Sequence, residues 1–308
     1  MSLFALIAAL SLEQFFPLAT RARLSAWLQS YLHFFHSHFN AGEHLHGKIA
    51  WFLAVLPLLV IVSLAHWLLS EILPFLAWAF DVAILYLIIG FHQFSDHYLA
   101  IQRALREEKL DEAERLLSVW RGVHTQGINA EEIARLSIEQ ALLVSQHRVF
   151  GVVVWFVLFS ALGLAGSAGA LLYRLALHLR AGWREQDDPF SDFSQQACAV
   201  LEWLPTRMSA ITFAIVGNFE DTLYCWRSQA HNWPDAEEGV LLSSAAGSLG
   251  VRLGMDITQG KQRVQRPELG LGDDADPEAM QSATGLVWRS VVVWLIALLM
   301  LSLANLLG

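Results

Sequence analysis

LVWRSVVVWLIALLMLSLANLL, from Leu286 to Leu307, is the stretch that decides the fold of this chain, and Arg289 is its only charged residue. A helix needs about 20 mainly apolar residues to cross the hydrocarbon core of a bilayer, which is about 30 Å thick. The stretch meets this length, and it follows a polar region rich in Gly, Asp and Glu. We therefore expect a chain that alternates between lipid and water.

The composition also indicates a membrane protein. Of the 308 residues, 55% are hydrophobic and only 16% are charged, and the mean hydropathy is +0.42. Soluble domains carry about 25% charged residues. The net charge of -9 argues against a nucleic-acid binder, which needs a basic face, so we expect no nucleic-acid partner. Cys198 and Cys225 have no metal-type spacing and are expected to be inert thiols.

The apolar runs predict an all-α fold, a polytopic helical membrane protein with about four to six membrane helices and helical cytoplasmic segments. The further strong candidates for membrane helices are Ile49–Ser70, Ile72–Gly90 and Phe150–Leu172. Leu3–Leu18 is a short fifth candidate. Leu204–Phe219, at about 16 residues, is shorter than a normal span and suits a re-entrant or buried helix as well. We expect these helices to form a single membrane domain.

The basic residues predict the orientation of the chain. Only Glu71 separates the runs Ile49–Ser70 and Ile72–Gly90, so we expect a tight hairpin whose two outer flanks face the same side. Those flanks, 19–48 and 93–148, are rich in Lys and Arg, whereas the turn between the runs has none. The positive-inside rule therefore places both flanks in the cytoplasm.

Two polar regions have different expected structures. Region 93–148 repeats apolar residues at three- and four-residue steps, which is typical of helices. Within it, Asp111 and Glu112 suit the first turn of a helix, and Asn129 is a candidate N-cap of the next one. Region 220–285 holds several glycines and is predicted to be a Gly-rich polar loop.

Five histidines crowd one short segment before Ile49. Neutral imidazole binds Zn, Cu or Ni well, and it titrates near neutral pH, so a metal site and a pH-responsive cluster are both alternatives. The aromatic residues between the histidines favour an amphipathic segment beside the membrane, and we predict no metal site. The histidines are His33, His36, His38, His44 and His46.

Two acidic residues lie inside apolar runs, where a charged group is costly and is a functional candidate by default. They are Glu13, in the first run, and Asp81, in Ile72–Gly90. We expect Asp81 to face inward, with His66 on the neighbouring run as a candidate partner. For Glu13, a functional role and a place at the interface or within the bundle are both open.

Three basic residues are candidates for binding an anion. Arg174 and His178 share one helical face, where they would either hold a phosphate or extend towards lipid headgroups. Arg252 lies in the Gly-rich stretch Ser243–Gly254, whose small residues allow close backbone approach. Such a stretch is also typical of a turn or a close helix crossing.

Three motifs resemble those of one protein family, the CobD/CbiB and AmpE superfamily of bacterial inner-membrane proteins. The stretch Ala245–Gly254 (AAGSLGVRLG) is similar to the Ala-Gly-x-Leu-Gly-Val-x-Leu-Gly motif of cobalamin-biosynthetic members. The segment Leu201–Arg207 (LEWLPTR) is similar to the family's Tyr-Ile-Pro-Ala-Arg segment. Ala104–Leu117 resembles the helical run before the family's Val-Gly-Arg-Asp-Thr motif. The resemblance covers nearly the whole length, and it implies a multi-pass protein of the bacterial inner membrane.

The resemblance implies a specific reaction for the cobalamin members. They are implicated in joining adenosylcobyric acid to aminopropanol or its phosphate, an amide-forming step that uses ATP and magnesium. If this chain were such a synthase, we would expect Glu139, Arg207 and Arg252 to converge on one pocket.

Several departures from the family pattern remove carboxylates. Arg121–Thr125 (RGVHT) stands in place of Val-Gly-Arg-Asp-Thr, and of the following Glu-rich motif only Glu139 survives. Leu177–Arg180 replaces an Asn-Thr-Leu-Asp motif, and Gln196–Ala199 replaces Arg-Leu-Asp-Asp. Because a lost carboxylate removes a metal ligand or a base, we expect the ligase chemistry to be absent.

The first expectation is therefore a non-catalytic inner-membrane protein with a regulatory or sensing role like that of AmpE. It would bind a corrinoid or a cell-wall-derived small molecule. The alternatives are a cobalamin biosynthetic synthase and a membrane transport or structural protein. The oligomeric state stays open.

Overall fold

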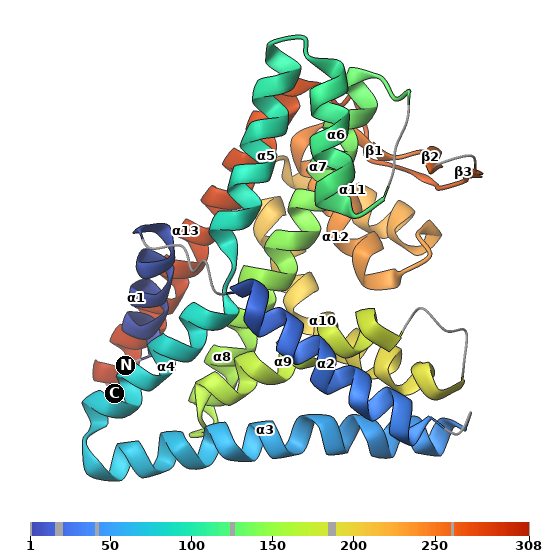
Figure 1. Ribbon diagram of the computed structural model, residues 1–308. Coiled ribbons are helices and arrows are strands. Elements are labelled where there is room, and N and C mark those ends of the chain that lie inside the picture. Colours follow the sequence, from blue (N-terminus) through green and yellow to red (C-terminus); the bar gives the residue numbers. More distant parts are fainter. Residues whose placement is uncertain are drawn as a thin grey trace. The chain divides into compact units, whose positions relative to one another are not determined.

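The computed structural model describes residues 2–15, 21–40, 43–123, 127–183, 189–259 and 262–307. The chain divides into two compact units, Met1–Phe91 with His147–Pro205 (unit 1) and His92–Gln146 with Thr206–Gly308 (unit 2). Helices dominate both units, and the strands, all in unit 2, are short (Figure 1). The all-α prediction is confirmed.

Unit 1 consists of helices and includes the first part of α10. Within it, α1 packs on α4, α3 packs on α4 and α9, and α2 lies against α3 and α9 (Figure 1). Its elements are α1 (Ser2–Phe15), α2 (Arg21–Phe39), α3 (His44–Ile72), α4 (Pro74–Ile88), a π-helical turn (Gln146–Phe150), α8 (Gly151–Ala161), α9 (Gly166–Trp183) and α10 (Pro189–Val216).

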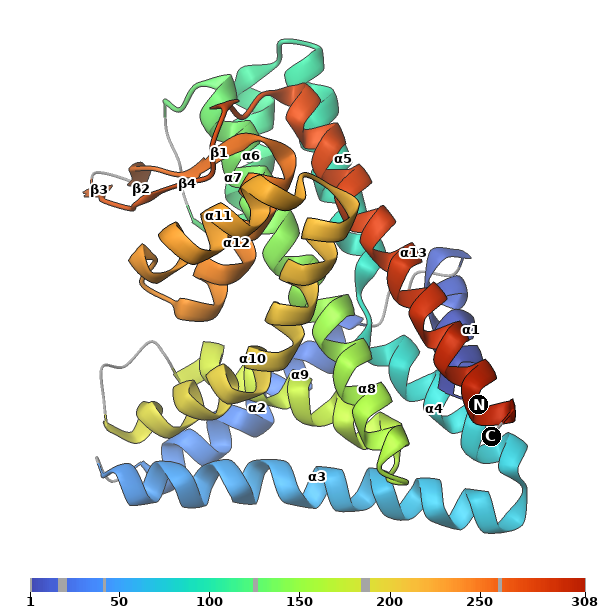
Figure 2. The ribbon, with the colours of Figure 1, turned by 180° about the vertical axis from the view of Figure 1, so that it is seen from behind.

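Unit 2 combines helices with two small sheets. One sheet has the order β4-β1-β5, in which β1 pairs antiparallel with β4 and parallel with β5, and the other is the β2–β3 hairpin (Figure 2). Its elements are α5 (Phe91–Arg106), α6 (Leu110–Arg121), α7 (Ala130–Ser145), the rest of α10, α11 (Phe219–Gln229), a 3-10 turn (Ala230–Asn232), α12 (Ala236–Leu249), β1 (Val251–Gly254), β2 (Ile257–Gln259), β3 (Gln262–Val264), β4 (Glu268–Leu269), β5 (Asp273–Asp274) and α13 (Pro277–Leu307).

Four helices within the described residues are long and apolar enough to cross a membrane. They are His44–Ile72, Ala130–Ala161, Pro189–Val216 and Pro277–Ala304. The last one belongs to α13, which contains the stretch Leu286–Leu307 and begins nine residues before it, at Pro277. The chain is therefore a polytopic helical membrane protein.

The predicted span Phe150–Leu172 is wrong. The chain instead forms a helical hairpin, in which α8 ends at Ala161 and α9 begins at Gly166. Gly163 has a φ of 73°, a left-handed conformation that ends a helix readily. A Cβ on Gly169 would overlap the carbonyl oxygen of Trp155, so this glycine lets the two helices lie close together.

Two further predictions about spans need correction. The predicted short segment Leu204–Phe219 is mostly the end of α10, a helix of 28 residues that begins at Pro189, continues through Pro205 and ends at Val216. Region 93–148 is helical as predicted, but its last helix runs on through the π-helical turn into Ala161. The cytoplasmic location of this region stays a prediction.

The tight hairpin predicted near Glu71 is confirmed. The helix α3 ends at Ile72, and Leu73 is extended, with φ −155° and ψ 123°. Pro74 then occupies the first turn of α4, where its missing N–H costs nothing. The first predicted run corresponds to α1, and its final residues, 16–18, lie outside the described residues.

The region 220–285 is not a polar loop. It contains α11, α12 and all five strands, and Ser243–Gly247 is buried. The side chain of Asp235 caps the first turn of α12, and Gly250 ends the helix with a φ of 68°. Packing decides this structure, because a Cβ on Gly247 would meet the backbone of α11 at Asp221. The prediction of a single membrane domain over residues 1–308 stays a prediction.

Local helix signals in region 93–148 were predicted correctly. Asp111 and Glu112 lie in the first turn of α6, where carboxylates interact favourably with the helix dipole. Asn129 is the N-cap of α7, and its side-chain oxygen accepts a hydrogen bond of 2.8 Å from the backbone N–H of Glu132.

Candidate functional site

The densest charged contact in unit 2 joins α7 to the segment after β1. Glu139 accepts hydrogen bonds from the backbone N–H of Gly254, at 2.8 Å, and from Arg266 Nη1 and Nη2, at 2.8 and 3.2 Å. The side chains of Glu139 and Arg266 are only 5% and 11% exposed. We call Glu139, Arg266 and the backbone of Gly254–Asp256 the clamp.

Arg266 fixes the backbone of the clamp as well as its carboxylate. Its Nη2 donates to the carbonyl oxygen of Gly254 at 3.0 Å, and its Nε donates to that of Met255 at 3.1 Å. The guanidinium also lies over the ring of Trp233, 5.1 Å from the centroid. The Nε, Nη1 and Nη2 atoms of Arg266 therefore all donate hydrogen bonds to acceptors of the clamp.

The backbone of the clamp has an uncommon conformation. Met255 has a φ of 61°, and residues other than glycine avoid this region unless their surroundings hold them there. Gly254 has a φ of 76°, and a Cβ on it would overlap the carbonyl oxygen of Pro267. Such strain is concentrated at functional sites, which makes the clamp a candidate site.

Two arginines accompany Glu139. Arg135 lies one helical turn before it on α7 and donates from Nη2 to the carbonyl oxygen of Asp256 at 3.2 Å. Arg121 is the last residue of α6, and its pKa is lowered, first by burial. The carboxylate of Glu139 opposes this shift, whereas the charges of Arg266 and Arg135 add to it.

The structure pairs Arg207 and Arg252 with carboxylates. Arg207 forms a very short ion pair with Glu237. Arg252 Nη2 lies 2.9 Å from Asp274 Oδ1, and its Nη1 lies 3.6 Å from Glu268 Oε1. Arg252 therefore has acidic neighbours where an anion was expected, and the convergence of Glu139, Arg207 and Arg252 on one pocket stays a hypothesis.

Unit 1 contains a second charged cluster, centred on Glu202. Its carboxylate lies 2.7 Å from His147 Nε2 and 2.5 Å from Arg180 Nη1, and its side chain is 3% exposed. The Sγ of Cys198, one helical turn earlier on α10, lies 3.6 Å from the same carboxylate. A buried acid is thus held by two basic side chains.

Arg174 and His178 lie close to this second cluster. Arg174 Nη1 is 3.4 Å from the carbonyl oxygen of His147, and His178 Nδ1 is 2.7 Å from the carbonyl oxygen of Arg174. Burial, followed by the positive charge of Arg174, lowers the pKa of His178 to about 4. His178 is therefore neutral at pH 7, and the pair carries one positive charge.

The polar residues predicted inside apolar helices are buried. Glu13, on α1, is 1% exposed. Asp81 is 9% exposed, and its Oδ1 lies 3.1 Å from His66 Nδ1, which confirms the predicted partner. Both cysteines are free and buried, as an inert thiol would be, and burial raises the pKa of Cys225 to about 11.

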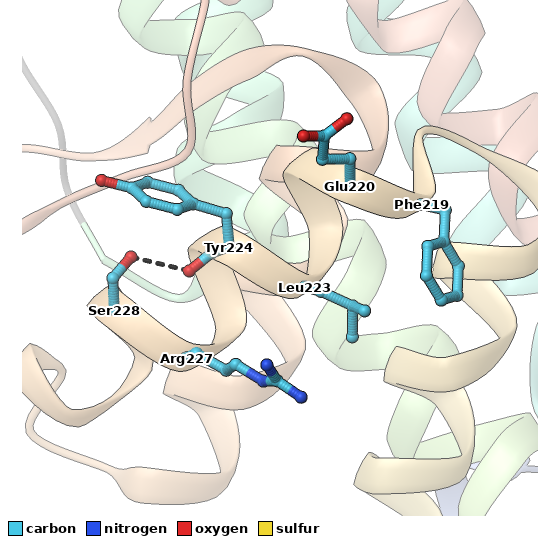
Figure 3. Close-up of a pocket in the computed structure, with 6 residues that line it drawn as sticks. All are labelled: Phe219, Glu220, Leu223, Tyr224, Arg227 and Ser228. Atoms are coloured by element: carbon cyan, nitrogen blue, oxygen red, sulfur yellow. Dashed lines mark hydrogen bonds between the residues drawn. The ribbon is translucent and has the colours of Figure 1, made fainter.

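An open groove runs along α11. Figure 3 shows its side chains in two rows at four-residue spacing, Phe219, Leu223 and Arg227 in one and Glu220, Tyr224 and Ser228 in the other. Phe219 and Tyr224 are 60% and 57% exposed. Because one helix supplies all six residues, a ligand here would have contacts on one side only, and the clamp is the stronger candidate.

The histidine segment and the carboxylates show no assembled metal site. Within the described ranges, no three His, Cys, Asp or Glu residues are close enough to hold a metal ion. His33 and His36 do stack, with ring centroids 6.4 Å apart. Glu139, Glu237 and Asp274 are each paired with an arginine, so we assign none of them to magnesium.

Sequence reasoning missed several residues of these clusters, and four of them show why. Arg266 and Trp233 lie far along the chain from Glu139, and no local pattern links them. Glu202 lies within the apolar sequence Leu201–Leu204, and an acid in that setting was a usable signal. Glu237 lies in the first turn of α12, two residues after the N-cap Asp235. Acidic residues are common at that position, so the sequence did not distinguish it from an ordinary first-turn residue.

The fold and these sites define a polytopic helical membrane protein with buried ion pairs among its helices. Comparison with known families then gives its identity at the family level. A model described as CobD/Cbib protein matches residues 6–287, and the chain belongs to this family.

Relatives of this chain carry the name "Cobalamin biosynthesis protein CobD". The one from Stutzerimonas stutzeri (strain A1501) is 34% identical over 290 residues, which cover 92% of this chain and 90% of the relative. The one from Chromobacterium violaceum is 33% identical over 258 residues, 83% of this chain and 80% of the relative. No solved structure matches the chain.

These relatives overturn the expected regulatory role. A non-catalytic, AmpE-like sensor was inferred from missing carboxylates, but relatives that align with nearly the whole chain are named for cobalamin biosynthesis. The absence of acids at the family's motif positions was therefore not evidence for a regulatory role. The structure shows further buried acids, Glu202 and Glu237, each held by an arginine. The segment His124–Thr125, which carries one of the departures, lies outside the described residues.

Proposed function

We propose that this protein is a cobalamin biosynthetic synthase, which joins the carboxyl group of adenosylcobyric acid to aminopropanol or its phosphate. The observation that carries the proposal is the 34% identity to a cobalamin biosynthesis protein over 92% of the chain. At that coverage the similarity extends over both units.

The reaction makes demands that the clamp meets in part. A carboxylate is unreactive towards an amine until a group such as a phosphoryl group from ATP activates it. The site must therefore hold several negative charges, and arginine is well suited to bind both carboxylate and phosphate groups. Arg121, Arg135 and Arg266 surround Glu139 in unit 2 and support placing the charged substrates there. ATP is thus a proposed co-substrate and magnesium a proposed cofactor, with no residue assigned to the metal.

The proposed location is the bacterial inner membrane, with region 93–148 on the cytoplasmic side. Unit 2 contains most of that region together with the clamp, so the proposal gives the clamp access to ATP. Of the other predicted ligand-binding residues, Arg207 and Arg252 belong to the same unit. Arg174 and His178 belong to unit 1, and their binding of a ligand stays a prediction.

Complementation of a synthase-deficient bacterium tests the proposal. The strain is grown on a medium where growth requires cobalamin, with either cobyric acid or cobinamide supplied. We expect this gene to restore growth on cobyric acid, while the empty vector supports growth only on cobinamide. Failure on cobyric acid, with the protein shown to be present in the membrane fraction, would contradict the proposed function.

A further inference from the structure

Two further basic side chains, Arg121 and Arg135, accompany the ion pair of Glu139 and Arg266. Arg121 ends α6, and Arg135 lies four residues before Glu139 on α7, so Arg135 and Glu139 are on the same helical face. Helices α6 and α7 pack against each other. The clamp therefore has two further guanidinium groups at its side.

Arg135 is buried with part of its hydrogen-bonding capacity unused. The residue is 8% exposed, and its buried Nε has no hydrogen-bond partner. Its Nη2 donates to the Asp256 carbonyl oxygen and lies 3.7 Å from Glu132 Oε1, which is too long for a strong hydrogen bond. A buried donor without a partner is unfavourable, so an acceptor from a ligand would be stabilised at this position.

Arg121 has a similar deficit. Over the part of the chain that the structure describes, its side chain forms no hydrogen bond or ion pair, and burial lowers its pKa. The charges that act on it are one carboxylate, Glu139, and two guanidinium groups, Arg135 and Arg266. The surroundings of Arg121 are therefore positive.

The nearby carboxylates do not correct this imbalance. The two oxygens of Glu139 already accept three hydrogen bonds, from Gly254 and Arg266. Asp274, which also acts on Arg135, is held at 2.9 Å by Arg252. The backbone N–H of Arg266 donates to Asp256 Oδ1 at 3.2 Å. Glu139, Asp256 and Asp274 thus have partners of their own, and Glu132 approaches only Nη2 of Arg135, at 3.7 Å, so among the described residues Arg121 and the Nε of Arg135 are left without an acceptor.

We propose that Arg121 and Arg135 bind the phosphate group of a phosphorylated ligand. A phosphate offers several acceptor oxygens to the paired donors of arginine, and it carries enough charge to balance two guanidinium groups. The identity of the ligand rests on the proposed function, which supplies two sources of the same group, ATP and aminopropanol phosphate. The clamp then occupies the Glu139 carboxylate with Gly254 and Arg266, which leaves the two arginines available to the phosphate.

Binding measurements on the full-length protein in detergent test this site. Calorimetry compares the wild type with R121Q for Mg-ATP, aminopropanol phosphate and unphosphorylated aminopropanol. Loss of charge-assisted hydrogen bonds should weaken one phosphorylated ligand by about 10- to 100-fold and leave aminopropanol unchanged. The ligand that weakens identifies the source of the phosphate. R121K should recover part of the loss, because the positive charge returns.

A matched variant and a second readout keep the result interpretable. R103Q changes an exposed arginine of α5 and should bind all three ligands as the wild type does. Equal binding by wild type and R121Q, an equal loss for aminopropanol, or no phosphate-dependent binding by the wild type would each overturn the site. If complementation succeeds while R121Q binds normally, only this site fails. If complementation fails while R121Q loses a phosphorylated ligand, only the proposed reaction fails.

Discussion

Arg266 Nη1 lies 2.8 Å from Glu139 Oε2, although 127 positions separate the two residues in the sequence. This ion pair fastens the segment after β1 to α7, and Arg266 also binds the carbonyl oxygens of Gly254 and Met255. The pair is almost completely buried. Each charged side chain therefore depends on the other for a neutralising counter-charge.

Removing the arginine of the clamp should destabilise the protein strongly. R266A leaves the Glu139 carboxylate buried without its counter-charge, which costs about 3–5 kcal/mol. We expect a clearly lower Tm in detergent than for the wild type. R103A, at an exposed position of α5, is the matched control and should leave the Tm unchanged. An equal Tm for R266A and R103A would show that the clamp does not stabilise the fold.

The close approach of α8 and α9 should depend on Gly169. G169A places a Cβ against the Trp155 carbonyl oxygen and the Phe159 ring, and such overpacking costs about 1–3 kcal/mol. G182A, near the end of the same helix, meets no atom within 4 Å and serves as the control. Thermal unfolding should separate the two variants. If G169A is as stable as G182A, residues 150–172 do not form the close hairpin described here.

His66 and Asp81 should behave as a coupled pair. Each single variant, H66L or D81L, leaves the other polar group buried without its partner, at a cost of about 1–3 kcal/mol. The double variant removes both groups, so its loss of stability should be smaller than the sum of the two single losses. A double-mutant cycle from unfolding in detergent measures this difference. Additive losses would mean that the contact contributes no stability.

The low pKa of His178 predicts acid-sensitive stability. The unfolded side chain binds a proton near pH 6.5 and the folded one near pH 4, so protonation favours the unfolded state as the pH falls. Between pH 7 and pH 5 this group should cost about 2 kcal/mol of unfolding free energy. H178Q should lose less stability than the wild type over that interval. Parallel pH profiles for the two proteins would contradict the assignment.

Features that depend on neighbouring residues could be predicted from the sequence. Asn129 caps α7 through the backbone N–H three residues later, a contact that residue type and spacing determine. The pairing of His66 with Asp81 follows from a short turn between two apolar runs, which brings polar residues on adjacent helices together.

Features that depend on backbone conformation or on distant contacts could not be predicted. Hydropathy runs unbroken through Gly163, so an average over residues 150–172 does not show the left-handed φ that divides the helices. The burial of Ser243–Gly247 likewise comes from close packing on α11, which a Gly-rich composition cannot distinguish from an exposed loop. Arg266 was missed because its partner is brought near only by the fold of unit 2.

Direct assay of the purified protein tests the central claim, that this chain is a cobalamin biosynthetic synthase. The protein in detergent or liposomes is incubated with adenosylcobyric acid, ATP, magnesium and either aminopropanol or its phosphate, and the corrinoid product is measured by mass spectrometry. The account predicts an amide product that requires both ATP and the protein. Intact adenosylcobyric acid after incubation, with protein that remains folded and with either amine supplied, would contradict it.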